Sequence, residues 1–241
     1  MYQKNKDKYI IDLFSGCGGF AEGFEKSGYK SYLAADFDFW SCETFKNRFK
    51  NTHVINEDIT TKKFKKILKS KMNGTPIEGV VAGLPCQSFS SVGRAQDKYS
   101  MRKDKRNYFY KDFFECLKII KPKFYVFENV RGILSAKPNG KKIFDDILNL
   151  SKKLGYVTLD NTSQMVFDTS EYGVPQVRKR VFVIGVLKKY SYIIPKIYDE
   201  LNNKSKEKKI FTVKDAIADL PSLRPGEGEE KLKFKNSSKN N

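Results

Sequence analysis

Short apolar runs alternate along the chain with stretches in which apolar residues recur every three or four positions. The runs, which are typical of buried strands, are 9–14, 31–35, 53–55, 79–83, 124–127, 156–159 and 180–187. The stretches, which are typical of amphipathic helices, are 20–27, 38–49, 61–72, 107–120 and 141–154. Strands that alternate with helices predict an α/β fold with a mostly parallel sheet and helices on both faces.

Two segments break this alternation. Residues 88–106 show almost no periodic spacing of apolar residues and contain several arginines and lysines. A loop this long in a compact domain is usually functional or disordered. Such a loop could close over phosphates, or it could simply be a solvated charged loop. Beyond about residue 195 the chain turns polar, so we expect one main domain over 1–195. Residues 196–241 are then a linker, a short helix near Val213–Leu220 and a disordered tail.

Composition narrows the class of protein. The formal net charge is +18, and basic proteins commonly bind nucleic acid. Only eight of the 46 basic residues are arginine, so the lysine excess can equally reflect coding bias. No apolar run is long enough to span a membrane, and no secretory signal precedes Tyr9. Four cysteines without a CxxC pair and one histidine argue against a metal site and a disulfide framework, so we expect a reducing cytoplasm.

Candidate chemistry follows three of the predicted strands. Leu84-Pro85-Cys86-Gln87 comes directly after 79–83, and Glu128-Asn129-Val130 ends the strand at 124–127. Gln176-Val177-Arg178-Lys179-Arg180 leads into the last strand. Open α/β sheets place their sites at the carboxyl ends of strands. A lone Cys86 is more often a buried small hydrophobe. Here a thiol, a carboxyl and a guanidinium together suit a nucleophile, a proton handler and an anion stabiliser.

A glycine turn follows the first strand. Residues 12–20 read DLFSGCGGF, and Gly16 and Gly18 partly fit a dinucleotide-binding fingerprint, in which backbone amides approach a ligand closely. Asp36 follows the second strand about twenty residues later, where an acid suits a pair of ribose hydroxyls.

Three further residues extend this candidate nucleoside site. Phe37 could stack on an adenine ring, and Asp58 and Ile59 could accept from the adenine amino group and cover the ring. Each of these residues alone is more often a helix cap or a core residue. Because all of them follow strands of one sheet, together they favour a nucleoside ligand.

The motifs DLFSGCGGF, GLPCQSFS, ENV and YGVPQVRKR occur in the order and spacing of the DNA cytosine-5 methyltransferases, which the chain resembles over roughly residues 8–187. Residues 104–112 also resemble the segment that opens a helix after the catalytic loop of that family. The resemblance implies a Rossmann-like fold that binds S-adenosylmethionine. It also implies methyl transfer to carbon-5 of cytosine in double-stranded DNA, as part of a restriction–modification system.

The resemblance also implies roles for single residues. Cys86 would be the nucleophile, Glu128 would contact the pyrimidine ring nitrogen, and Arg178 would brace the ring and Glu128. The cofactor would bind at Phe14, Gly16, Gly18, Asp36, Phe37, Asp58, Ile59 and Pro85. Contacts to the substrate and to the loop would come from Gln87, Ser90, Gln176 and Arg180.

The chemistry itself requires these residue types. Carbon-5 of cytosine is a poor nucleophile, and attack of a thiolate on carbon-6 makes it enamine-like. A carboxyl with a raised pKa suits donation to the ring nitrogen, and the fixed fork of an arginine suits the ring oxygen. The target atom is inaccessible inside a stacked duplex, so the base must flip out, and a mobile loop could close behind it.

The chain departs from the family after its last strand. Single-chain members continue into a recognition domain, an arginine-rich helical motif and an Asn-Ala-Val-like motif, none of which is visible here. Residues 211–221 resemble the family segment just before recognition. We therefore expect the catalytic subunit of a two-chain enzyme, with a second subunit supplying recognition. The competing interpretations are an inactive truncated remnant and a non-catalytic DNA-binding subunit.

Three other classes are less favoured. A nicotinamide oxidoreductase could use the glycine turn and Asp36 but has no need for Pro-Cys-Gln together with Glu-Asn-Val. Methyltransferases of exocyclic amino groups carry an Asp/Asn-Pro-Pro-aromatic motif where this chain has Leu84-Pro85-Cys86-Gln87. Cytosine-5 methyltransferases of tRNA share the cysteine motif but are normally complete single chains.

Overall fold

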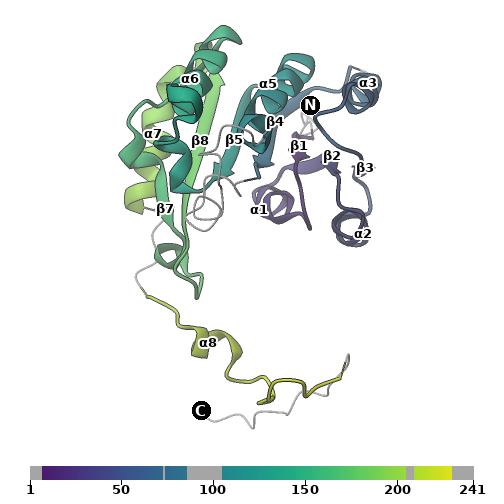
Figure 1. The fold of residues 1–241 in the computed structure, drawn as a ribbon, viewed down its shortest axis with the longest axis vertical. Helices are drawn as coiled ribbons and strands as arrows, with labels where there is room; N and C mark the ends of the chain where they lie inside the picture. The colour runs from purple at the N-terminus through teal and green to yellow at the C-terminus, as the bar shows by residue number, and fades with distance from the viewer. Residues whose placement is uncertain (1–6, 73, 86–104, 205–208, 230–241) are drawn as a thin grey trace, which may run out of the picture.

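The computed structural model describes residues 7–72, 74–85, 105–204 and 209–229. The sheet runs in the order β3 (His53–Asn56), β2 (Lys30–Asp36), β1 (Tyr9–Leu13), β4 (Ile77–Gly83), β5 (Phe124–Asn129), β8 (Lys179–Leu187) and β6 (Tyr156–Thr158), and β7 (Val166–Asp168) pairs with β8 (Figure 1). The first five strands in this order are mutually parallel, and β8 is antiparallel to β5, β6 and β7. The predicted, mostly parallel α/β sheet is confirmed.

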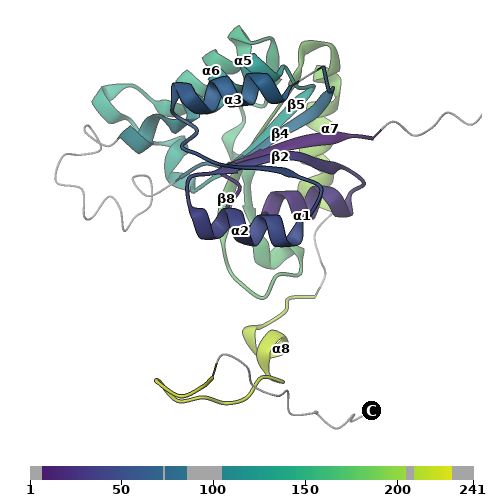
Figure 2. The ribbon, with the colours of Figure 1, turned by 90° about the vertical axis from the view of Figure 1, so that its right-hand side faces the viewer.

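Helices cover both faces of the sheet. Helices α1 (Gly19–Lys26) and α2 (Phe39–Arg48) lie on one face, and α3 (Lys62–Lys71), α5 (Phe109–Ile120) and α6 (Ile143–Lys153) lie on the other (Figure 2). Every predicted helical stretch is a helix. Short 3-10 turns occur at Lys105–Tyr108 (η1), Arg131–Leu134 (η2), Pro138–Gly140 (η3), Thr162–Met165 (η4), Thr169–Tyr172 (η5) and Lys188–Ile193 (η6).

Local chemistry sets several helix starts. The Asp38 side chain accepts a hydrogen bond from Ser41 N at 2.8 Å and caps α2, as its position in the sequence predicts. Thr61 caps α3 in the same way, by accepting from Phe64 N at 3.0 Å. These side chains satisfy amide groups that would otherwise lack partners in the first turn.

The core is continuous from β1 to β8 and rich in aromatic rings. Phe113 of α5 packs edge-on against Tyr125 and Phe127 of β5, with ring centroids 5.7 and 5.6 Å apart. All three side chains are fully buried. The apolar stripe predicted for residues 107–120 therefore faces the sheet, and α5 is held at a fixed distance from the strand that carries Glu128.

The packed part of the chain extends past residue 195. Helix α7 (Ile194–Asp199) and the π-helical turn Glu200–Lys204 follow β8. Tyr198 is 1% exposed; its hydroxyl donates to Phe182 O at 2.9 Å and accepts from Ile184 N at 3.1 Å. The predicted boundary at 195 therefore falls inside a helix that is docked on β8. Beyond it, α8 (Val213–Ile217) has no buried residue.

A buried carboxyl lies beneath the glycine turn. Asp12, at 0% exposure, accepts from Ala21 N at 3.3 Å through Oδ2. Its Oδ1 has no hydrogen-bond partner among the residues that the structure describes. Burial raises the pKa of Asp12 well above its usual range, and the carboxylate of Asp36 adds to the effect.

This raised pKa predicts a pH-dependent effect of Asp12→Asn. The unfolded chain loses the Asp12 proton near pH ~4, whereas the folded chain keeps it to higher pH, so the free energy of unfolding falls as pH rises above ~4. We expect the variant to match the parent near pH ~4 and to exceed it by about 1–3 kcal/mol near pH ~8. Urea denaturation at both pH values measures this, and a variant that is less stable near pH ~8 would contradict it.

Candidate active site

The carboxyl ends of the parallel strands meet at one edge of the sheet. Leu13 of β1 is in register with Ala35 of β2 and Ala82 of β4, and Gly83 of β4 is in register with Glu128 of β5. The glycine turn, Asp36, Pro85 and Glu128 all follow or end these strands. The topology therefore places the glycine turn, Asp36, Pro85 and Glu128 at one edge of the sheet.

Glu128 is held by an arginine from β8. Its Oε1 lies 2.8 Å from Arg180 Nε and 3.9 Å from Arg178 Nη2. The side chains of Glu128 and Arg180 are 20% and 19% exposed, against 47% for Arg178. Glu128 is opposite Phe182 in the antiparallel ladder, so Arg180, two residues away, projects to the same face. From the sequence we expected Arg178 to hold Glu128 in place, but Arg180 lies closer to the Glu128 carboxylate.

The environment of Glu128 changes its acidity. Burial raises the pKa of the Glu128 carboxyl, and the guanidinium groups of Arg180 and Arg178 lower it by a smaller amount. The net effect is a pKa above the ordinary glutamate value. A carboxyl of this kind can hold a proton nearer to neutral pH and donate it to a neighbouring base.

The chain that leaves β4 is fastened beside Glu128. Leu84 N donates to Glu128 O at 3.2 Å, and the Asn129 side-chain amide donates to Leu84 O at 3.4 Å. Asn129 is 1% exposed, so its amide contributes to the positioning of this segment. Pro85 is the last residue described before the gap at 86–104. Cys86, Gln87 and Ser90 lie outside the described residues, and their roles stay predictions.

A cavity of about 360 Å³ opens at the same edge. It is lined by Phe14, Phe37, Asp58, Ile59, Pro85, Arg106 and Phe109. Five of these seven are predicted cofactor residues, which the fold brings together. Arg106 and Phe109 are additional. The sequence placed Phe109 in the core stripe of a helix, although it also lies within residues 104–112, which resemble the segment after the catalytic loop of the family.

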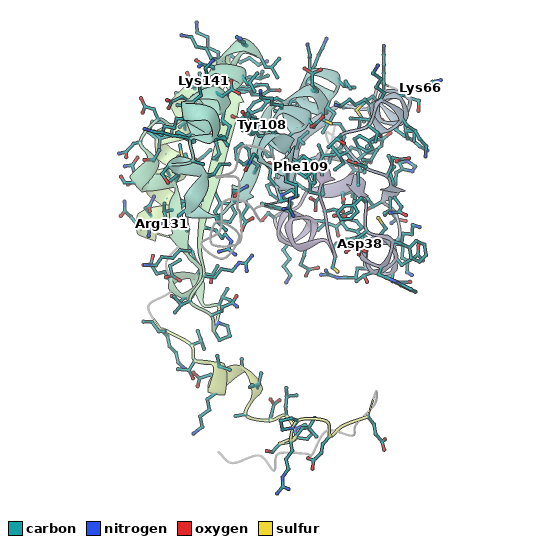
Figure 3. All side chains as sticks on the ribbon, viewed as in Figure 1. Asp38, Lys66, Tyr108, Phe109, Arg131 and Lys141 are labelled. Atoms are coloured by element: carbon teal, nitrogen blue, oxygen red, sulfur yellow. The ribbon has the colours of Figure 1, made fainter. Side chains whose placement is uncertain are left out.

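Two aromatic rings form one side of this cavity. The rings of Phe14 and Phe109 stack with centroids 5.7 Å apart, and Figure 3 shows Phe109 at the start of α5. Phe14 has a φ of 55°, in the left-handed region that non-glycine residues rarely adopt. Strained backbone of this kind is often found at ligand sites.

The glycine turn is shaped by Asp36. The Asp36 carboxylate accepts from Gly16 N at 2.9 Å and from Asp38 N at 3.0 Å. It is not among the residues that line the cavity, and a role toward ribose stays a prediction. Gly16 and Gly18 have φ of 50° and 91°. A Cβ on Gly18 would come within 2.9 Å of the Phe45 ring, so packing as well as backbone conformation requires a glycine there.

Two other residues complete the description of this edge. The Ser15 hydroxyl is buried in the glycine turn and has no hydrogen-bond partner among the described residues, and sequence reasoning did not single it out. Gln176 is exposed; its backbone oxygen accepts from Thr169 Oγ1 at 2.7 Å, in the turn that leads to Arg178.

Within the described ranges there is no cluster of three potential metal ligands. None of the described helices is long and apolar enough to cross a membrane.

Comparison with known proteins agrees with this geometry. The family model of the C-5 cytosine-specific DNA methylases matches residues 9–241. The Type II methyltransferase M.DdeI of Desulfomicrobium norvegicum is 38% identical over 222 residues, which cover 92% of this chain and 50% of that protein. The Type II methyltransferase M.AquIA of Picosynechococcus sp. is 31% identical, and the match covers 91% of each chain.

A solved structure is similar as well. The crystal structure of a protein described as a DNA modification methyltransferase, encoded within an E. coli prophage, superposes with a TM-score of 0.71 at 32% identity, covering 90% of this chain and 56% of that one. The chain thus spans about half the length of several proteins that it matches. The chain belongs to the C-5 cytosine-specific DNA methylase family.

Proposed function

We propose that this chain is the catalytic part of an enzyme that transfers a methyl group from S-adenosylmethionine to carbon-5 of cytosine in duplex DNA. The observation that carries the proposal is the Glu128–Arg180 pair, at 2.8 Å, beside the segment that leads to Cys86. A carboxyl with a raised pKa, an arginine and a cysteine on adjoining strand ends provide the groups that addition to cytosine requires.

The cavity suits the proposed cofactor. Its volume, about 360 Å³, lies in the range of small-molecule sites. The rings of Phe14, Phe37 and Phe109 offer faces for a flat base, and the carboxylate of Asp58 can accept from its amino group. S-adenosylmethionine, when bound, supplies an activated methyl group.

The chain's own residues account for the remaining chemistry. The Cys86 thiolate forms a bond to carbon-6 of a flipped-out cytosine, and Glu128 donates its proton to the ring nitrogen as charge develops there. Methylation of carbon-5 is followed by loss of its proton and elimination of the Cys86 sulfur, which restores the ring double bond. Arg180 holds Glu128 in place, and its Nη1 donates to Lys179 O at 2.9 Å, which fixes the guanidinium plane.

We further propose that a second polypeptide completes the enzyme and brings DNA recognition. An apolar groove of about 390 Å³ lies against β5 and β8, between α1 and the segment after α7; Phe20, Phe24, Val126, Phe182 and Leu201 are among its walls. Helix α8 also exposes apolar side chains, with Val213 60% and Ile217 50% exposed. Exposed apolar surfaces of this kind support packing against further protein.

The two arginines are expected to differ in importance for stability. Arg180→Ala leaves a half-buried Glu128 without its near partner, so the free energy of unfolding should fall by about 1–3 kcal/mol near pH ~8. Arg178→Ala should cost less than about 1 kcal/mol. The loss in Arg180→Ala should shrink as the pH falls, because without the guanidinium the pKa of Glu128 rises further and protonation removes the unpaired charge.

Urea denaturation of the two variants checks this, and Glu128→Gln in the Arg180→Ala background is the control. The neutral side chain should recover most of the loss, because the buried charge is gone. Equal losses for the two single arginine variants would show that the 2.8 Å contact is not the one that matters.

The proposed activity is tested by transfer of a labelled methyl group from S-adenosylmethionine to mixed-sequence duplex DNA. The chain is assayed alone and together with any neighbouring-gene product that carries a recognition domain. We expect transfer in the mixture, and its loss to background in Cys86→Ala. Transfer by the chain alone would mean that no second polypeptide is required. Absence of methyl transfer in both assays would contradict the proposed function and favour an inactive remnant or a non-catalytic DNA-binding role.

A further inference from the structure

A second cleft, of about 730 Å³, opens between the first turns of α5 and α6. One wall carries Tyr108 and Tyr110, and the other is the 3-10 turn η3 with the start of α6; Figure 3 marks Tyr108 and Lys141, which both line the cleft. None of its lining residues belongs to the cofactor cavity or to the Glu128–Arg180 pair. Nothing in the proposed mechanism uses this cleft.

The cleft has an excess of positive charge. Lys111, Lys137, Lys141 and Lys142 line it, together with only two carboxylates. Both carboxylates are already engaged. Asp146 accepts from the Tyr110 hydroxyl at 2.6 Å and lies 3.8 Å from Lys111 Nζ. Asp145 lies 3.7 Å from Lys142 Nζ.

Two of the lysines are therefore left available. Lys137 and Lys141 are exposed, and neither has a carboxylate within ion-pair distance among the residues that the structure describes. Like charges placed in one concavity raise the local potential and attract an anion. The cleft therefore offers two free ammonium groups to a ligand with more than one negative charge.

The segment that presents these lysines is fastened to the fold. Gly140 N donates to Lys137 O at 3.1 Å, and Ile143 N donates to Ala136 O at 3.0 Å. Ala136 and Ile143 are each 2% exposed. Because both ends of the turn are held, the two ammonium groups stand on a defined support rather than on a loose surface loop.

The cleft adjoins the proposed active site. Tyr108 lines the cleft, and the next residue, Phe109, lines the cofactor cavity and stacks on Phe14. Helices α5 and α6 both begin at the edge of the sheet where β5 ends, at Glu128 and Asn129. Under the proposed function, duplex DNA presents a base to Glu128 at this edge, and the cleft opens at the same edge.

We propose that this cleft binds backbone phosphates of the DNA flanking the target cytosine, through Lys137 and Lys141. The inference deepens the proposed function, since it assigns a sequence-independent anchor to the catalytic chain itself. Lysine contacts to phosphate carry no base information, and they hold the duplex in position against the site. Recognition of sequence is then a separate task.

The test compares Lys137→Ala/Lys141→Ala with a matched control, Lys66→Ala/Lys69→Ala, which removes the same charge from exposed positions of α3. Binding of a fluorescent duplex is followed by anisotropy over a range of salt concentrations. The cleft variant should bind roughly 3- to 10-fold more weakly at low salt, and its salt slope should fall by about 1.8, or about 0.9 for each lost phosphate contact. The control should change the slope by less than about 0.5.

Lysine footprinting of the unmodified chain provides a readout that does not depend on variant folding. Bound duplex should protect Lys137 and Lys141 from acetylation and leave Lys66 reactive. Equal losses in the two double variants, or no protection of Lys137 and Lys141, would overturn the inference. If methyl transfer occurs and is lost in Cys86→Ala, but bound duplex does not protect Lys137 and Lys141, then the phosphate-binding role of the cleft is wrong and the proposed function stands. If bound duplex protects Lys137 and Lys141 but no methyl transfer occurs, then the proposed function is wrong and the cleft still binds DNA.

Discussion

The register of three adjoining strands is the constraint on which the site depends. Gly83, Glu128 and Phe182 stand in one row across β4, β5 and β8. Because of this register, Glu128 Oε1 lies 2.8 Å from Arg180 Nε. The segment that leads from β4 toward Cys86 also begins beside Glu128, since Leu84 N donates to Glu128 O. A slip of one residue in either pairing would turn one of these groups to the other face of the sheet. The buried aromatic core between α5 and β5 makes such a slip costly.

The shape of the glycine turn between β1 and α1 depends on two buried carboxyl groups as well as on its glycines. Asp36 accepts from the backbone amide of Gly16, and Asp12 accepts from Ala21 at the start of α1. These contacts hold the turn between β1 and α1, next to Phe14 in its left-handed conformation. Burial raises the pKa of Asp12 and of Glu128 alike, so two carboxyls with raised pKa lie at this edge, one beneath the turn and one at the site.

Much of the fold could be predicted from the sequence, since its strands and helices are regular enough to read from apolar periodicity. The three-residue strand β7 was too short to give a pattern. The docking of α7 was missed because Tyr198 is buried through tertiary contacts. Arg178 precedes β8 and Arg180 lies within it, two residues apart, so the sequence alone does not show which is nearer to Glu128. Phe109 was interpreted as core because a helical stripe does not reveal a cavity wall.

The central claim is that Cys86 attacks carbon-6 of a cytosine whose ring nitrogen receives a proton from Glu128. Duplex DNA in which 5-fluorocytosine replaces cytosine tests it most directly, because after methyl transfer the fluorine cannot leave carbon-5 as a proton does, and the adduct persists. The account predicts a denaturant-resistant complex of the chain, with its partner polypeptide if one is needed, that forms only with S-adenosylmethionine and maps to Cys86. Methyl transfer to unmodified DNA without any such complex, or a complex that maps to another residue, would contradict it.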